Sequence, residues 1–397
     1  MRCCRQKLTD FIVGHNEWAM LLSATLHWGE IFGGLAILLV VLYDIFQSVV
    51  LPRPAINKLA TVRYLVRGLY WSWRWIGNRM SSIPRRERWL ATYGPVGVLT
   101  IFVAWGAALV LAYGMIIDGV RDELRPVPQS FGTSLYFSAS TLVPLSYGDF
   151  VPEGVPARLT TIAESATGVI LAALAITLLF SLYQSFQRRE ELVVTLDAFA
   201  GAPPSGVQML ETASTHGMPE ELIKTFDDWR QWAAAVLESH LAYPMLVFFR
   251  SSHDNEAWLN SFGAVMDAAV LVMSTVEDKS EGPAKLMYRV GNHLVEDLSW
   301  YFRRWTPRSD SPIIERFEFD EAWERLKKAG YRCKPADEAW PNFARFRSTY
   351  ASPINGLARA LVIIPAEWIG DRTYLPHLVG SSRRGRAGGG RRKPPTR

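Results

Sequence analysis

Cysteine is scarce in this sequence: its 397 residues include three, Cys3, Cys4 and Cys333. Three cysteines at this spacing form neither a disulfide framework nor a metal site. No Gly-x-Gly-x-x-Gly motif follows a strand pattern, so no dinucleotide-binding gating domain is indicated. The sequence also has no nucleophile paired with a general base and no metal motif. These two absences argue against an enzyme, and we expect neither a cofactor nor a resident metal.

Charge is nearly absent from three long stretches. Residues 31–51 contain one charged side chain, Asp44, residues 95–117 contain none, and residues 159–183 contain only Glu164. About 20 apolar residues are needed for a helix to cross a bilayer, where the backbone must satisfy its own hydrogen bonds. Buried helices of a soluble fold are the alternative, but such helices rarely lack charge over these lengths. The sequence therefore predicts an all-α membrane protein with three transmembrane helices.

Acidic side chains are almost missing between residues 52 and 94, which carry nine Lys or Arg residues and only Glu87. Lys and Arg in short loops mark the cytosolic side. The N-terminus would then lie outside and the C-terminal domain in the cytosol, in a multi-pass protein of the cell (inner) membrane. Aromatic and Arg residues alternate in this basic loop, which indicates a helix in the headgroup layer. A voltage sensor is the alternative, but it needs evenly spaced cations within a long apolar segment.

The composition of the first and last residues also allows predictions. Residues 1–30 form an N-terminal segment. Its first 26 residues lack the apolar run and small-residue cleavage site of a signal peptide, so we expect a retained membrane anchor. Residues 381–397 contain seven cations and no acid, which predicts a disordered tail. The tail and the basic loop would contact anionic lipid. Nothing in the charge distribution indicates a nucleic-acid partner.

The long C-terminal region has the composition of a soluble domain, with 27 acids and 19 bases between residues 190 and 380. Helical patterns follow one another here, separated by Gly, Pro and short polar stretches such as Ser352-Pro353. We therefore expect an α-helical cytosolic domain over residues 187–380. Its predicted helices cover residues 206–216, 218–249, 254–277, 283–305, 317–329 and 337–363.

An uncharged helical stretch that is too short to cross a bilayer lies between the second and third spans. Residues 130–142 extend for about 20 Å at 1.5 Å per residue, and a turn and extended chain follow them. Non-helical backbone at this depth survives only where it is buried in protein or lines water. The pattern predicts a re-entrant loop, and a pore is the simplest reason for one.

This loop contains Leu135-Tyr136-Phe137-Ser138, then Thr141, and then Ser146-Tyr147-Gly148-Asp149. With its half-helix and two flanking spans, it resembles the pore helix and selectivity filter of the potassium-channel superfamily. The resemblance covers residues 95–186 and implies a pore domain made of an outer helix, a pore loop and an inner helix. It assigns the filter to Pro144, Leu145, Ser146, Tyr147, Gly148 and Asp149.

The same resemblance implies roles for residues around the filter. Thr141 and Glu164 would support the filter from behind, and Tyr147 would pack against the pore helix. Gly168 lies where the family places a hinge glycine, although close helix packing explains a glycine here equally well. The predicted lining residues of the inner helix are Ala172, Ile176 and Phe180.

Two filter positions depart from the family pattern. Pro144 lacks the hydroxyl that completes the innermost ion site of the family. Ser146 replaces a glycine expected to need a positive φ, at a cost of about 1–2 kcal/mol. Because one loop supplies a quarter of a filter, we expect a homotetrameric channel for potassium or another monovalent cation, with weakened selectivity. The alternative is a non-conducting membrane sensor or scaffold that retains a degenerate pore domain.

Overall fold

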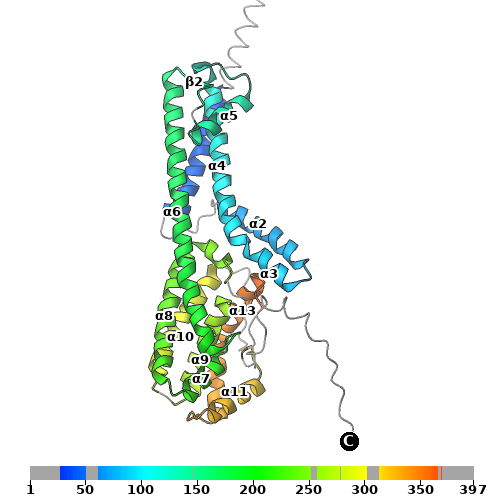
Figure 1. Ribbon diagram of the computed structural model, residues 1–397, viewed down its shortest axis with the longest axis vertical. Coiled ribbons are helices and arrows are strands. Elements are labelled where there is room, and N and C mark those ends of the chain that lie inside the picture. The colour runs from blue at the N-terminus through cyan, green and yellow to red at the C-terminus, as the bar shows by residue number, and fades with distance from the viewer. Residues whose placement is uncertain are drawn as a thin grey trace, which may run out of the picture. The chain divides into compact units, whose positions relative to one another are not determined.

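The computed structural model describes residues 27–50, 61–145, 147–251, 257–277, 279–301, 313–364 and 368. The chain divides into two compact units, both largely helical, as the sequence predicted (Figure 1). Unit 1 comprises Met1–Leu69 and Val96–Ser181, and unit 2 comprises Tyr70–Pro95 and Leu182–Arg397. Some parts named above lie outside the described residues: Cys3, Cys4, Ser146, residues 51–60 and the tail 381–397.

Within the described residues, three helices are long and apolar enough to cross a membrane, which confirms the predicted number. They are His27–Val49, Ile83–Gly119 and Val155–Ala200. The first ends in a π-helical turn, η1 (Phe46–Val50), and the second consists of α3 (Ile83–Ala91) and α4 (Tyr93–Gly119).

The first span packs closely against α4 at Gly34. A Cβ at this position would lie 2.5 Å from the carbonyl oxygen of Ala112, so no larger residue fits without separating the two helices. Small residues commonly bring membrane helices together in this way. This contact makes the first span and α4 one packed pair within unit 1.

Helix α6 (Val155–Ala200) is much longer than the inner helix predicted over residues 159–185. Its 46 residues extend for about 69 Å at 1.5 Å per residue. The prediction stopped where the apolar stretch ends, but no proline interrupts the helix until the chain turns at Gly201, whose φ is +80°. One continuous helix therefore belongs to unit 1 up to Ser181 and to unit 2 from Leu182 onward.

The segment between α4 and α6 contains η2 (Arg121–Glu123), β1 (Leu124–Arg125), α5 (Phe131–Leu142) and β2 (Val151–Pro152). Helix α5 agrees with the stretch predicted over residues 130–142, because Ser130 is its N-cap and accepts a hydrogen bond from the N–H of Thr133. The two strands pair antiparallel, which the sequence did not predict. They join the two ends of a loop that begins with a short helix.

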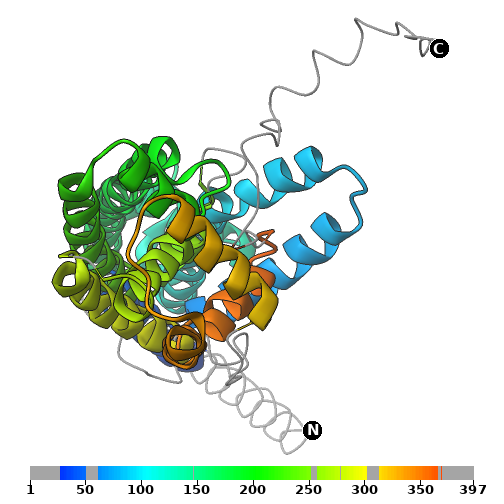
Figure 2. The same ribbon diagram turned by 90° about the horizontal axis from the view of Figure 1, so that it is seen from below.

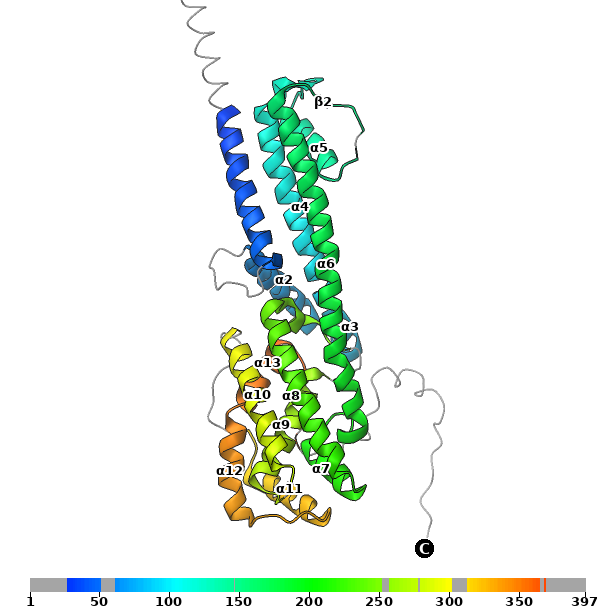
Figure 3. The same ribbon diagram turned by 90° about the vertical axis from the view of Figure 1, so that its left-hand side faces the viewer.

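Unit 2 contains a bundle of helices (Figure 3), and most of them agree with the predicted ones. Helix α9 is the most deeply buried of the bundle, since nearly all of its side chains are covered. The elements are α7 (Gly206–Thr215), α8 (Pro219–Ala242), η3 (Pro244–Phe248), α9 (Trp258–Ser274), α10 (Glu281–Tyr301), α11 (Arg316–Lys328), α12 (Ala336–Ser348) and α13 (Ala351–Ala360).

The helix predicted over residues 337–363 is in fact two helices, and the break predicted at Ser352-Pro353 is wrong. The chain turns at Thr349 and Tyr350 instead. Pro353 lies in the first turn of α13, where the missing N–H of a proline would have no partner inside the helix anyway. A proline near the start of a helix therefore gave a misleading signal.

Helices α2 (Thr61–Asn78) and α3 form a hairpin within the basic loop (Figure 2). Trp73 and Trp89 stack with ring centroids 4.3 Å apart, and each indole N–H donates to the backbone carbonyl of the other residue, at 3.0 and 3.1 Å. Tyr70 donates to the carbonyl of Ala360 in α13 at 2.8 Å. From Tyr70 onward the hairpin is thus part of unit 2, a tertiary contact that the sequence did not reveal.

Candidate functional site

Helix α5 is tied to both of its neighbours by small polar side chains. The hydroxyl of Ser134 donates to the carboxylate of Asp118 in α4 at 2.6 Å. From the other side, Ser165 of α6 donates to the carbonyl oxygen of Thr141 at 3.1 Å. Thr141 is itself buried. The end of the pore helix is therefore fixed from the α6 side, at a residue for which the sequence predicts a support role.

Glu164 of α6 is completely buried and is bonded to the middle of α5. Its Oε1 accepts a hydrogen bond from the hydroxyl of Ser138 at 2.5 Å, whereas its Oε2 has no partner among the described residues. Hydrogen bonds to a carboxylate are stronger than those between neutral groups. Glu164 is therefore hydrogen-bonded directly to the pore helix. That Glu164 also supports the filter stays a prediction.

Gly168 lies where α6 passes the end of α5. A Cβ at this position would be 1.8 Å from the carbonyl oxygen of Leu142, the last residue of α5. Any side chain here would push the two helices apart. The contact with Leu142 supports close packing as the explanation for this glycine. Its role as a hinge stays a prediction.

The chain turns sharply after α5 and enters the predicted filter. The N–H of Leu145 donates to the carbonyl of Ser140 at 2.8 Å, which closes the turn. Gly148 has a φ of +77°, a backbone conformation that residues other than glycine rarely adopt. Tyr147 is 66% exposed in the single chain, and its packing against the pore helix stays a prediction.

The predicted filter and pore-lining residues are exposed in the single chain wherever the structure describes them. This holds for both sets, although they belong to different parts of unit 1. The filter set is Pro144, Leu145, Tyr147, Gly148 and Asp149, and the lining set is Ala172, Ile176 and Phe180. Ser146 lies outside the described residues. The chain thus leaves these residues uncovered, and what faces them must come from outside it.

Glu123 fixes the base of the loop, a role that the sequence did not suggest. Its Oε2 accepts a hydrogen bond from the N–H of Ala157 in the first turn of α6 at 3.0 Å. Its backbone carbonyl accepts from the N–H of Glu153 at 2.8 Å. A negative charge is favoured at a helix N-terminus, where backbone N–H groups are unpaired. Glu123 and Ala157 are 34 positions apart, so no local pattern could have paired them.

The comparison with protein families bears on this same region. Residues 98–185 match the family described as Ion channel. The match begins in α4, includes α5 and the loop, and ends in α6. This region belongs to the ion-channel family. It is of the potassium-channel type with two spans, which confirms the resemblance seen in the sequence, and residues 98–185 are called the ion-channel domain below.

Two curated relatives extend the comparison beyond the ion-channel domain. The uncharacterized membrane protein YdjJ of Bacillus subtilis is 23% identical over 209 residues, which cover 51% of this chain and 59% of that protein. The delayed-rectifier potassium channel regulatory subunit KCNS1 of Mus musculus is 23% identical over 142 residues, covering 35% of this chain and 27% of that protein. The chain thus spans less than two thirds of either relative. No solved structure gives a significant match.

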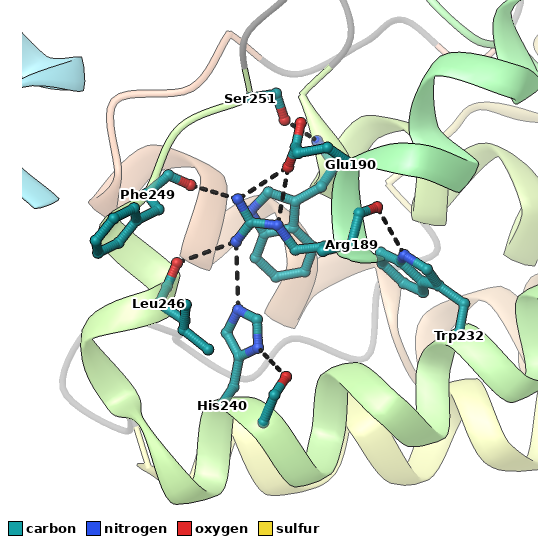
Figure 4. A network of polar contacts seen from close by, with 9 residues as sticks. Arg189, Glu190, Trp232, His240, Leu246, Phe249 and Ser251 are labelled. Carbon is teal, nitrogen blue, oxygen red and sulfur yellow. Dashed lines mark hydrogen bonds and ion pairs between the residues drawn. The ribbon is translucent and has the colours of Figure 1, made fainter. Parts of the chain in front are cut away.

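Beyond the ion-channel domain, α6 enters the core of unit 2 at Arg189 (Figure 4). This guanidinium is only 2% exposed. It pairs with Glu190 at 2.9 Å and donates to the carbonyls of Leu246 and Phe249 at 3.0 and 2.5 Å. Removing a buried charge from such a set leaves its partners unsatisfied. The last turns of α6, the helix in which the ion-channel domain ends, are thus fixed within unit 2.

His240 of α8 completes this network and is held neutral. Its Nδ1 lies 2.9 Å from the carbonyl oxygen of Val236, and its Nε2 lies 3.4 Å from the guanidinium of Arg189. Burial, followed by the charge of Arg189, lowers the pKa of His240 to about 3. The histidine can therefore accept from Arg189 through Nε2 without adding a second buried positive charge.

Proposed function

We propose that this chain is one subunit of a homotetrameric cation channel of the potassium-channel type. The observation that carries the proposal is the position of α5, which ends at Leu142 directly before the exposed filter residues. The C-terminal end of a helix carries partial negative charge. Backbone carbonyls beyond it can replace the hydration shell of a cation. The end of α5 and the residues after it therefore offer a permeating ion negative charge and carbonyl oxygens together.

The ion is potassium or another monovalent cation, passed with weakened selectivity. Pro144 and Ser146 are the reasons, because the first lacks a hydroxyl and the second replaces a glycine of the family pattern. Neither change removes a backbone carbonyl, so a pathway for cations remains. A channel of this kind has no catalytic step, which agrees with the lack of a catalytic signature in the sequence.

The protein is an integral membrane protein, and we propose the cell (inner) membrane as its location, with the N-terminus outside and unit 2 in the cytosol. The nine cations between residues 52 and 94 support this orientation. The basic loop and the tail would bind anionic lipid at the cytosolic surface. Thr141 and Glu164 would support the filter, and Gly168 would be the gating hinge of α6. The residues that would line the cavity are Ala172, Ile176 and Phe180.

A second candidate function is a non-conducting subunit or membrane sensor that retains the ion-channel domain. The name of one relative, a potassium channel regulatory subunit, favours it. The two departures in the filter favour it as well. Such a protein would keep the packing around Glu164 and Gly168 while losing the flux.

Cation flux through purified protein in liposomes separates the two candidates. We expect wild type to pass monovalent cations with a weak preference for potassium, measured as the reversal potential in mixed K⁺ and Na⁺. The double change Pro144→Thr and Ser146→Gly should shift this potential towards potassium by more than the two single changes together. A tenfold gain in discrimination corresponds to about 1.4 kcal/mol, which is similar to the backbone strain expected at Ser146.

Ser81→Gly is the matched control, since it makes the same substitution at an exposed serine of the α2–α3 turn. It should leave the reversal potential unchanged. A double mutant that conducts with unaltered selectivity would contradict the assignment of residues 144–148 to the filter. Silence of both wild type and double mutant in an intact tetramer would favour the regulatory candidate.

A further inference from the structure

A cavity of about 330 Å³ lies in unit 1, away from the pore loop. It is lined by the first span, by α4 and by Leu65 of α2, and its walls are almost wholly apolar. Val40 lies on its rim and is largely exposed, so the cavity opens at the surface of the chain. A cavity of this size falls within the range of small-molecule sites, about 300–1,000 Å³.

One carboxylate, that of Asp44, lines this cavity. The side chain is only 5% exposed. Its Oδ2 accepts a hydrogen bond from the indole N–H of Trp105 at 3.0 Å, and its Oδ1 is buried with no partner among the described residues. An ionised carboxylate inside an apolar helix is costly unless it is paired. The cavity thus combines apolar walls with one acceptor that has no donor in the part of the chain that the structure describes.

We propose that this cavity binds an organic ammonium group carried on an apolar body. The ammonium would donate to Oδ1 of Asp44, and the apolar part would fill the space beside Ile37, Ile101 and Ala104. Among the described residues, none that lines the cavity is basic, so this part of the chain supplies no positive charge to Asp44. A charge-assisted hydrogen bond is stronger than the bond that a neutral alcohol could donate.

The permeating ion is a poorer occupant. Hard cations prefer several oxygen ligands, and the cavity offers a single carboxylate. It is also lined by the first span and α4, whereas the predicted pathway follows the loop and α6. The site is therefore independent of whether the channel conducts.

The ammonium could come from two sources, an aminophospholipid of the bilayer or a free alkylamine. The test uses full-length protein in nanodiscs of phosphatidylcholine and phosphatidylglycerol, labelled with a photoreactive alkylamine and mapped by mass spectrometry. We expect saturable labelling at the residues of the first span and α4 that line the cavity. Decylamine should compete with the label, and decanol should compete at least tenfold more weakly.

Two kinds of variant test the charge and the space separately. In Asp44→Asn, competition by decylamine should be at least tenfold weaker than in wild type. Asp44→Glu keeps the carboxylate and should retain most of the wild-type competition. Ala104→Phe should abolish labelling by filling the cavity while Asp44 remains. Asp122→Asn, at an exposed carboxylate outside the cavity, is the matched control and should behave as wild type. Each variant is first checked for an unchanged oligomer by size-exclusion chromatography.

Phosphatidylethanolamine added to the nanodiscs separates the two sources. Protection from labelling that is lost in Asp44→Asn would identify the bilayer lipid as the occupant, and lack of protection would leave the free amine. The proposal is overturned if wild type is not labelled in the cavity, if decanol competes as well as decylamine, or if Asp44→Asn, well folded, binds decylamine as tightly as wild type.

Discussion

Asp44 and Glu164 are two buried carboxylates in the apolar helices of unit 1, and each has one bonded and one unpartnered oxygen within the described residues. Their surroundings differ. Asp44 lines a cavity, whereas Glu164 contacts the pore helix through Ser138. We therefore assign a ligand to the first and a structural contact to the second. A buried acceptor that loses its donor costs about 1–3 kcal/mol, so both carboxylates can be tested by removing a partner.

Glu164 provides the prediction at this scale. Glu164→Gln keeps an oxygen that can accept from Ser138. Glu164→Ala removes this acceptor together with the buried side chain, and leaves the Ser138 hydroxyl only the carbonyl oxygen of Val110, at 3.0 Å. We expect the alanine variant to lower the stability of the tetramer by about 1–3 kcal/mol and the glutamine variant by less. Thermal unfolding in detergent measures both. Ser138→Ala is the complementary variant: it leaves Oε1 of the buried Glu164 without its donor, so it should also lower the stability by about 1–3 kcal/mol.

Equal damage from Glu164→Gln and Glu164→Ala would point to the charge itself, and so to direct contact with the ion. The sequence identified both acids because charge is so rare in the apolar stretches. It could not identify their partners, since Ser138 and Trp105 lie 26 and 61 positions away along the chain. Such contacts depend on how helices pack, and no local pattern records them.

At the scale of elements, local patterns in the sequence predicted the helices well, but they did not predict contacts between distant segments. The pore helix has its expected bounds because Ser130 caps it and because its apolar length is short. The continuation of α6 to Ala200 was missed, since apolarity ends near residue 185 although helical propensity does not. The pairing of β1 with β2 was missed because each strand has two residues, too few for an alternating pattern.

Helix α2 of the α2–α3 hairpin has a buried face and an exposed face. Val66, Tyr70 and Gly77 of α2 are buried on one face, while Tyr64, Arg67, Trp71 and Trp75 are exposed on another. The guanidinium of Arg79 lies 3.5 Å from the ring centroid of Trp75. Helix α4 begins two residues after α3 ends, so the hairpin is adjacent in sequence to a span. An exposed face of aromatic and basic residues so near a span suits a layer of anionic headgroups.

The prediction for the hairpin concerns anionic lipid. Adding phosphatidylglycerol to phosphatidylcholine nanodiscs should raise the melting temperature of wild type. The double change Arg67→Gln and Arg79→Gln should remove much of this rise, since a cation near an anionic surface contributes about 1 kcal/mol. Arg289→Gln, at an exposed arginine of α10, is the control and should leave the rise intact. A rise that is the same in all three proteins would refute lipid binding by this face.

At the scale of the whole molecule, the chain leaves its own inner helix largely uncovered. Only 6% of the apolar stretch of α6 is buried within the chain, compared with 39% for that of α3 and α4. Lipid, water or other subunits must cover the rest. In the proposed tetramer, each chain would supply one quarter of the filter, and four copies would place the exposed filter residues around a common axis and cover part of α6.

The last prediction tests this assembly and the lining face at once. Native mass spectrometry should show four chains, and deletion of residues 381–397 should leave that number unchanged. Ile176→Asp should also leave a tetramer, because a charged side chain is tolerated where a helix faces water. Ile170 is about equally exposed in the single chain but lies on a different face of α6, which in the proposed tetramer would face lipid or a neighbouring subunit. Ile170→Asp should therefore break the tetramer. If Ile176→Asp breaks it as readily, the face formed by Ala172, Ile176 and Phe180 does not line an aqueous cavity.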